Sequence, residues 1–178
     1  MVELRTERLI LRELTLDDVP AFNAIDAHPD VARWVWLPGP SLDDTRRNIE
    51  FIVQSGGEEP RTIYVFAIVT RADDRLIGRC GMDLTGPEST LGMVGYAMHR
   101  DLWGQGLMTE AMRALVGFGF GELGLHRIGA DADPRNIASW RVLEKVGMRR
   151  EGHLIENELM NDEWCDSYVY AMLDREWA

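Results

Sequence analysis

Two glycines placed just before an apolar helical pattern are the first residues of this sequence that could serve a ligand. Gly104 and Gly106 separate an apolar segment that ends near Met98 from the helical pattern that begins at Gly106. Glycines let the backbone approach a ligand closely, and the free N–H groups of a first helical turn, with the helix dipole behind them, can bind a pyrophosphate. No Gly-Lys-Ser/Thr follows as in a P-loop, and Thr109 occupies the last position of the dinucleotide fingerprint, so amides would do most of the binding. Glycines that only form a turn are the alternative.

A second polar pair lies where another strand pattern meets a helical one. Pro134 ends the strand pattern, and Asn136 and Ser139 follow at the helix start, where both side chains can face one edge of the helix. The simpler interpretation is that Asn136 caps the helix and that Ser139 is merely early in it. Taken alone, neither residue decides between a structural and a functional role.

The elements that position these residues are predicted from apolar spacing and from cap and turn residues. Their order is strand, two helices, three strands, helix, strand, helix and two strands, which is an α+β arrangement with helices covering a mostly antiparallel sheet. We expect a single domain over residues 1–178. The expected strands are 8–14, 63–69, 76–82, 91–98, 127–132, 148–159 and 164–173, and the expected helices begin near 15, 41, 106 and 136.

The composition excludes several classes of function. Of the 178 residues, 46% are hydrophobic and 28% are charged, as in an ordinary globular domain. The formal net charge of −11 opposes sequence-independent nucleic-acid binding and would attract a cationic amine, and no apolar run is long enough for a membrane helix. Cys80 and Cys165 stand far apart, and the four histidines share no ligand spacing. We therefore expect a cytoplasmic protein without a disulfide or a metal.

Five runs of residues carry a resemblance that spans nearly the whole chain. They are Thr6-Glu7-Arg8-Leu9-Ile10-Leu11-Arg12, Trp103-Gly104-x-Gly106 with Thr109-Glu110-Ala111, Asn136-x-x-Ser139-x-Arg141-Val142-Leu143-Glu144-Lys145-x-Gly147-Met148, Glu151-Gly152-His153-Leu154 and Asp162-x-Trp164-x-Asp166. In this order they resemble the GNAT acetyltransferases, and in detail the RimJ/RimL-type branch that acetylates ribosomal-protein N-termini. Trp103 and Met108 depart from the family's Arg/Gln-x-x-Gly-x-Gly/Ala loop, although Trp commonly precedes the first glycine in this branch.

The resemblance implies a GNAT-like fold with a mixed sheet of about seven strands, a splayed strand pair and about four helices. It also implies an enzyme that transfers the acetyl group of acetyl-CoA to a primary amine by direct attack in a ternary complex, with CoA as product. The strand near Met98 would leave amides free for pantetheine, the glycine loop would bind the pyrophosphate, Asn136 would contact the pantetheine arm, and Ser139 would lie near the sulfur. The residues expected to bind the cofactor are Tyr96, Ala97, Met98, Trp103, Gly104, Gln105, Gly106, Leu107, Met108, Thr109, Asn136 and Ser139.

Acetyl transfer requires a neutral amine, a polarised thioester carbonyl and a proton for the leaving thiolate. A backbone N–H near Ala97 or Met98 is the candidate donor to the carbonyl, and Ser139 is the candidate acid, directly or through water. Glu158 is the candidate base, because its position resembles that of the acidic residue proposed for this role in the branch. An ordinary exposed strand carboxylate is the alternative. A covalent role for either cysteine lacks a neighbouring histidine pattern.

The acceptor is the part of the function that the sequence determines least. An α-amine titrates at about 7.7–8.0, well below lysine, which favours the N-terminus of a protein as the acceptor. The alternatives are a small amine, such as a polyamine, an aminoglycoside or an amino-acid conjugate, and a non-catalytic acyl-CoA-binding module. Either a monomer or a homodimer is compatible with the sequence. An aromatic loop could form an acceptor wall or part of the core, and its residues are Trp34, Trp36, Leu37, Pro38 and Pro40.

Overall fold

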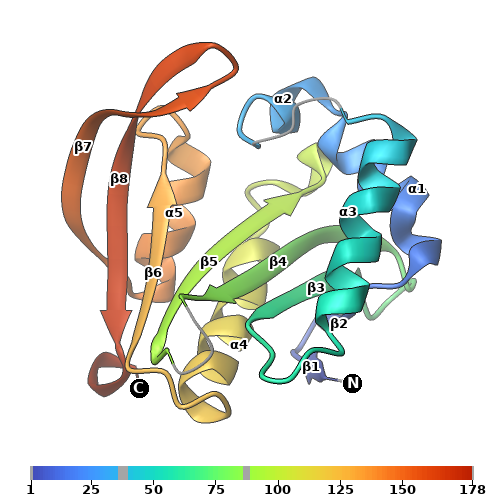
Figure 1. Ribbon diagram of the computed structural model, residues 1–178, viewed down its shortest axis with the longest axis horizontal. Coiled ribbons are helices and arrows are strands. Elements are labelled where there is room, and N and C mark those ends of the chain that lie inside the picture. Colours follow the sequence, from blue (N-terminus) through green and yellow to red (C-terminus); the bar gives the residue numbers. More distant parts are fainter. Residues whose placement is uncertain (1, 36–39, 86–88, 178) are drawn as a thin grey trace.

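The computed structural model describes residues 2–35, 40–85 and 89–177, so Trp36, Leu37 and Pro38 of the expected acceptor wall lie outside the described residues. The described residues form an eight-stranded sheet in the order β1-β2-β3-β4-β5-β6-β8-β7 (Figure 1). Neighbouring strands are antiparallel except for the parallel pair β5 and β6. The strands are β1 (Glu3–Arg5), β2 (Leu9–Glu13), β3 (Ile63–Thr70), β4 (Leu76–Leu84), β5 (Leu91–Met98), β6 (Arg127–Ala132), β7 (Arg149–Met160) and β8 (Glu163–Leu173). The helices are α1 (Val19–Asp26), α2 (Pro29–Ala32), α3 (Leu42–Ser55), α4 (Leu107–Gly121) and α5 (Ile137–Val146).

The expected α+β fold is confirmed, with one strand more than the expected seven among the described residues. The additional strand, β1, pairs with β2 and is only three residues long. Such a short strand shows no alternation that would reveal it in the sequence. The short α2 was not expected either. The closing pair is confirmed as the β7–β8 hairpin, and Asn161 and Asp162 turn it at φ of 52° and 62°, the conformation of a two-residue type I′ turn.

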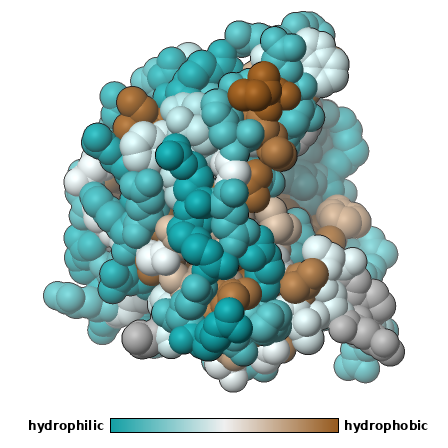
Figure 2. All heavy atoms as spheres, turned by 90° about the vertical axis from the view of Figure 1, so that its left-hand side faces the viewer, coloured by the Kyte–Doolittle hydropathy of each residue, from teal (hydrophilic) through white to brown (hydrophobic). Residues whose placement is uncertain are grey.

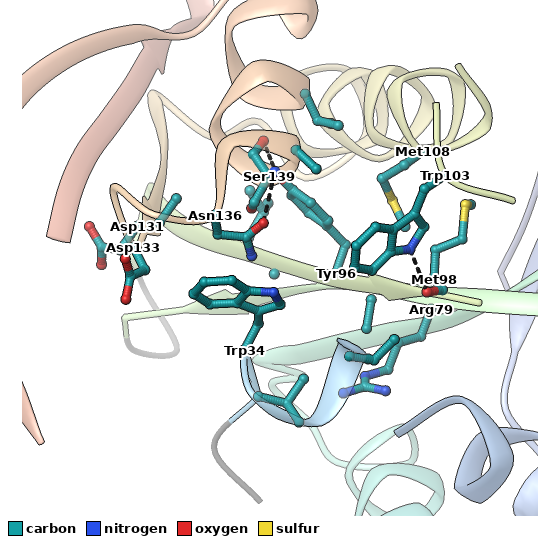
Figure 3. A pocket seen from close by; sticks show the side chains of 18 of the residues that line it. Trp34, Arg79, Tyr96, Met98, Trp103, Met108, Asp131, Asp133, Asn136 and Ser139 are labelled. Atoms are coloured by element: carbon teal, nitrogen blue, oxygen red, sulfur yellow. Dashed lines mark hydrogen bonds between the residues drawn. The ribbon is translucent and has the colours of Figure 1, made fainter. Parts of the chain in front are cut away.

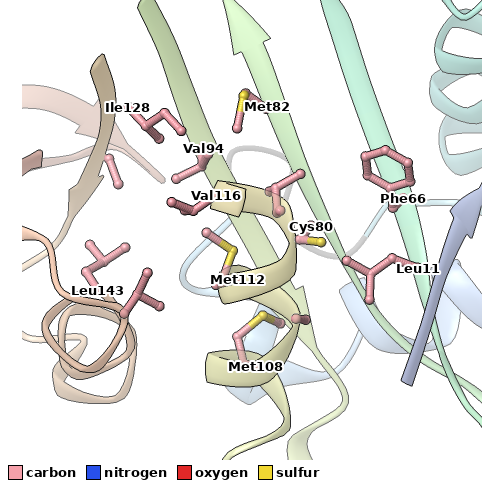
Figure 4. Close-up of a cluster of buried hydrophobic side chains, with 14 of the residues drawn as sticks. Leu11, Phe66, Cys80, Met82, Val94, Met108, Met112, Val116, Ile128 and Leu143 are labelled. Atoms are coloured by element: carbon pink, nitrogen blue, oxygen red, sulfur yellow. The ribbon is translucent and has the colours of Figure 1, made fainter. Parts of the chain in front are cut away.

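Helices cover both faces of the sheet, with α4 and α5 on one face and α1 and α3 on the other (Figure 1). Phe66 and Ile68 of β3 belong to the core under α4, whereas Ala67 and Val69 belong to the core under α1 and α3. Figure 4 shows α4 side chains, including Met112, packed against residues of the central strands. Because successive strand side chains point to opposite faces, residue parity decides which face each side chain can serve.

The helix starts follow the cap residues of the sequence. The Ser41 hydroxyl accepts a hydrogen bond from the Asp44 N–H at 3.1 Å, and the Asp44 carboxylate accepts one from the Ser41 N–H at 3.1 Å, which is the capping box expected at α3. At α5, Asn136 is the N-cap and Gly147, at φ of 112°, ends the helix.

The edge strand β7 is largely exposed and mostly hydrophilic. Figure 2 views this side of the molecule and shows separate apolar spots within a hydrophilic surface. Leu154, Ile155 and Leu159 are the exposed large apolar residues of β7. Within the described ranges, no helix combines the length and the apolar character needed to cross a membrane.

Strands β4 and β5 lie close together near the end of β5. A Cβ built on Gly78 would lie 2.6 Å from the carbonyl oxygen of Ala97 on β5, a distance that only a backbone shift could relieve. A Cβ built on Gly95, also on β5, would meet no atom within 4 Å. The two glycines therefore differ in what a methyl group would encounter.

Gly78→Ala should destabilise the protein by about 1–3 kcal/mol, because overpacking against backbone forces the two strands apart. The matched control Gly95→Ala should leave the free energy of unfolding within about 1 kcal/mol of the parent or raise it, since a loss of chain entropy in the unfolded state is all that changes. Denaturant unfolding of the three proteins measures this difference. Equal stability of the two variants would contradict the close approach.

Candidate active site

The functional region begins where two neighbouring strands of the sheet part. Strand β5 pairs with β4 from Gly92 to Met98 but with β6 only from Leu91 to Met93, and beyond that point β5 and β6 diverge (Figure 1). The second half of β5 therefore has a paired edge toward β4 and an edge without a strand partner toward β6. This is the splayed strand pair that the family resemblance implied.

The hydrogen bonds at both ends of β5 show which backbone groups face the gap. The His99 N–H donates to the Ile77 oxygen at 2.8 Å, and the Thr85 N–H donates to the Leu91 oxygen at 3.2 Å, so odd-numbered residues of β5 face β4. Antiparallel pairing alternates, and the backbone groups of Val94, Tyr96 and Met98 accordingly face the gap. The alternation favours Met98 over Ala97 as a donor to a ligand and adds Val94, which the sequence argument missed.

The start of α4 lies just beyond the end of β5. Gly104 and Gly106 adopt φ of 78° and 77°, and Gly106 is an N-cap without a side chain. The first intrahelical bond is donated by Glu110 to the Gly106 oxygen, so the N–H groups of the three preceding residues have no partner within the helix. The side chains of Leu107 and Met108 are largely buried in the core.

Arg8, near the N-terminus, holds this glycine loop in place. Its Nη1 donates to the Gln105 carbonyl at 3.1 Å, and its Nε forms an ion pair with Glu110 at 2.6 Å. The backbone N–H of Arg8 donates to the same carboxylate at 2.8 Å. The sequence motif contains Arg8 and Glu110, but nothing in their spacing indicated that they meet.

Trp103 and Gln105 are oriented by contacts within the protein. The Trp103 indole Nε1 donates to the Met98 carbonyl at 2.9 Å, with the Arg100 guanidinium 4.8 Å above its ring, so Trp103 joins the end of β5 to the loop (Figure 3). Gln105 is exposed, its side-chain amide donates to the Asp101 carbonyl, and it does not line the cavity described below.

The expected pair at α5 meets Tyr96 across the gap. The Ser139 hydroxyl donates to the Tyr96 oxygen at 3.1 Å, and the Tyr96 hydroxyl donates to the Ser139 carbonyl at 2.8 Å. Burial raises the pKa of Tyr96, which keeps its hydroxyl protonated. The side-chain Oδ1 of Asn136 accepts a hydrogen bond from the Ser139 N–H at 3.2 Å, so Asn136 does cap the helix (Figure 3). Its side-chain NH₂ is left for a ligand.

One cavity of about 980 Å³ joins these parts. The gap-facing strand, the loop and the first turn of α4, and both polar residues of α5 line it. Trp34 and Pro40 also line it, and Figure 3 shows Trp34 opposite Asn136. Expected cofactor residues that line it are Tyr96, Ala97, Met98, Trp103, Gly104, Gly106, Leu107, Met108, Thr109, Asn136 and Ser139.

Glu158 lines this cavity from β7. From the hairpin turn, Met160, Leu159 and Glu158 pair regularly with Glu163, Trp164 and Cys165. The pairing becomes irregular only beyond Glu158, where four residues on β7 match two on β8, with Glu156 at φ of 44°. Glu158 is half-buried, and burial followed by the charge of Asp131 raises its pKa.

The cysteines differ in their surroundings. Cys80 is fully buried in the core, and burial raises the pKa of its thiol. Cys165 lines the cavity, and Arg135 donates to its sulfur at 3.1 Å. In the described part of the chain, no group of three or more His, Cys, Asp or Glu side chains could hold a metal ion.

Known proteins resemble this chain in sequence and in fold. Residues 8–149 match the family model described as an acetyltransferase (GNAT) domain. The chain is 31% identical over 181 residues to an uncharacterized N-acetyltransferase p20 of Bacillus licheniformis, covering 100% of this chain and 99% of the relative. It is 30% identical over 85 residues to the ribosomal protein uS5-alanine N-acetyltransferase of Escherichia coli strain K12, covering 48% of this chain and 44% of that one.

A solved structure has the same fold as this chain. That structure is of RimL, a ribosomal L7/L12 alpha-N-protein acetyltransferase, in complex with coenzyme A. Its TM-score is 0.86 at 19% identity, with coverage of 97% of this chain and 98% of that one. The family model covers most of this chain, and relatives along its whole length are N-acetyltransferases. The chain therefore belongs to the GNAT family of N-acetyltransferases.

Proposed function

We propose that this enzyme transfers the acetyl group of acetyl-CoA to the N-terminal α-amine of a protein, in a complex that holds both substrates at once. The observation that carries the proposal is the alignment of two sets of backbone donors. The gap-facing groups of β5 run directly toward the uncapped start of α4, and both line one cavity. A ligand with a phosphate at one end and an extended amide-bearing arm fits this line.

The residues present fit the cofactor at both ends of that line. A Cβ on Gly104 would meet no atom within 4 Å, so the loop leaves room beside the free amides of α4, where a pyrophosphate would bind. The pantetheine arm would then run back along β5, past Met98 and Tyr96, with the Asn136 amide on its other side. The thioester end, farthest from the helix, would lie near Val94 and Tyr96, and Met98 would contact the arm closer to the helix.

Acetyl-CoA supplies the acetyl group and a thiolate leaving group, and the chain supplies the donors and the proton transfers. A gap-facing N–H of β5 donates to the carbonyl oxygen of the thioester. Glu158 takes the proton of the acceptor ammonium. This deprotonation costs less free energy for an α-amine than for a lysine, because the α-amine has the lower pKa. The Ser139 hydroxyl gives a proton to the sulfur, and Tyr96 orients that hydroxyl through their two hydrogen bonds.

The choice of a protein N-terminus rests on the acidic cavity and on the relatives. A relative and a structural neighbour are named for acetylating ribosomal proteins, which supports a polypeptide acceptor. A small amine is the second candidate, because the same negative charge, −11 over the chain, would attract a polyamine.

Mass spectrometry of a competition mixture separates these acceptors. The mixture contains acetyl-CoA, peptides that begin with a free Ala or Ser, the same peptides with a blocked N-terminus and one internal Lys, and a set of polyamines. We expect acetylation of the free peptide N-termini first. Faster modification of the polyamines would support the small-molecule acceptor, and CoA binding without any acetylated product would support the non-catalytic module.

Gly104→Glu should lower the affinity for CoA at least about 100-fold, since it places a negative charge where the pyrophosphate would bind. Gly124→Glu is the matched control, because Gly124 also has a positive φ, 64°, and open space around its Cβ, but lies beyond the other end of α4. The control should leave affinity within about threefold. Calorimetric titration with CoA measures both, and equal affinities would refute the phosphate site.

Ser139→Ala and Glu158→Gln should each lower kcat by roughly 100-fold while the KM for acetyl-CoA changes little, as expected for groups that act on protons. Cys165→Ser is the control for a covalent route, since Cys165 lines the same cavity. It should keep kcat within about threefold. Steady-state kinetics decides, and loss of activity in the cysteine variant together with ping-pong patterns would replace direct attack by an acyl-cysteine route.

A further inference from the structure

One peptide of the glycine loop is held by a side chain from the N-terminal part of the chain. The Gln105 carbonyl accepts a hydrogen bond from Nη1 of Arg8 at 3.1 Å, and no other donor reaches that oxygen among the described residues. Arg8 also lies against the next residue, because a Cβ built on Gly106 would be 3.7 Å from its Nη2. The guanidinium therefore covers one side of the peptide between Gln105 and Gly106.

The direction of that carbonyl decides the direction of the next N–H group. The peptide between Gln105 and Gly106 is trans, and the C=O and N–H bonds of a planar trans peptide point in opposite directions. Because the Gln105 oxygen points to Arg8, the Gly106 N–H points away from Arg8. Gly106 lines the large cavity, Arg8 does not, and the Gly106 N–H has no acceptor within the described ranges. The peptide therefore offers an unused donor on the cavity side.

The backbone of the loop does not by itself prevent this peptide from turning over. A flip changes ψ of Gln105 and φ of Gly106, and glycine adopts either sign of φ readily. Gly106 has φ of 77° in the orientation seen here. After a flip, the carbonyl oxygen would face the cavity in place of the N–H and would repel a phosphate. The bond from Arg8 therefore selects the orientation that can bind an anion.

Arg8 is itself fixed by Glu110 in the first turn of α4. The Glu110 carboxylate accepts hydrogen bonds from Nε of Arg8 at 2.6 Å and from the Arg8 backbone N–H at 2.8 Å. The Thr6 hydroxyl donates to the same carboxylate at 2.6 Å. The Glu110 side chain is only 18% exposed, and its backbone N–H donates to the Gly106 oxygen at 3.1 Å. Glu110 thus holds both the guanidinium and the glycine that follows the peptide.

We propose that Arg8 is a positioning residue for the cofactor, which sets the peptide after Gln105 so that the Gly106 N–H donates to a pyrophosphate oxygen of CoA. The inference rests on the proposed use of acetyl-CoA and gives a role to a residue that does not line the cavity. The ligand class is a pyrophosphate ester. The guanidinium acts on it through the peptide and does not contact it.

The test is Arg8→Gln, with the affinity for CoA measured by calorimetric titration. Glutamine lacks the planar fork with which arginine bonds a carboxylate and a carbonyl at once. The peptide can then turn over, and the affinity for CoA should fall at least about tenfold, because a hydrogen bond to a charged group is lost.

Steady-state kinetics of Arg8→Gln separates positioning of the loop from general damage to the protein. The KM for acetyl-CoA should rise, whereas kcat and the KM for the amine should change little, because the reacting atoms lie at the other end of the cofactor. S-acetylpantetheine, a thioester that ends before the pyrophosphate, should be used with the same kcat/KM by the parent and the variant.

Arg71→Gln is the matched control, because Arg71 holds the same N-terminal segment without touching the loop. Its Nη1 donates to the carbonyls of Thr6 and Glu7 at 2.9 and 3.0 Å. In the described part of the chain, its side chain forms no hydrogen bond or ion pair with residues 103–110. The control removes the same charge as Arg8→Gln and should keep the affinity for CoA within about threefold of the parent.

An Arg8→Gln variant that binds CoA as tightly as the parent would overturn the positioning role and leave acetyl transfer intact. An equal loss of affinity in Arg71→Gln would also overturn it, because a loosened N-terminal segment would then explain the result. So would a fall in kcat/KM for S-acetylpantetheine as large as that for acetyl-CoA. A parent that binds no CoA would end both the proposed function and this inference.

Discussion

The structure depends on a break in strand pairing that no other strand repairs. Strand β5 pairs with β4 over its whole length but with β6 for only three residues. Backbone donors and acceptors that lose a strand partner need another one, and here Val94, Tyr96 and Met98 direct theirs into a cavity. The Met98 carbonyl is satisfied by the Trp103 indole, and the remaining groups face the space that the cofactor is proposed to fill. The break therefore makes a binding site out of main-chain atoms.

Around this break, the charged groups are arranged so that few remain free. Arginines pair with three carboxylates of the cavity wall, Asp26, Asp44 and Asp133. Arg8 forms an ion pair with Glu110 and so holds the glycine loop in place. Phosphate binding is thus left to amides and the helix dipole, which an acidic protein needs if it is to bind an anion. Asp131 and Glu158 also line the cavity, and neither has an ion pair among the described residues.

Much of this could be predicted from the sequence, for identifiable physical reasons. Glycines before an apolar helix and a proline followed by a capping asparagine are local signals, and both mark the junctions that line the cavity. The contact between Arg8 and Glu110 joins residues distant in the chain and leaves no local signal. The irregular pairing of β7 next to Glu158 is a feature that no periodicity reveals. Asp131 also lines the cavity, and no motif in the sequence marked it.

The gap between β5 and β6 also has a topological consequence for inhibition. A molecule that joins CoA to an acceptor would place its linking atoms in this gap, at the level of Val94 and Tyr96. Because the gap closes at Met93 and widens toward Met98, such a compound would enter from the open end. The length of its linker would then report the distance between the two substrate sites.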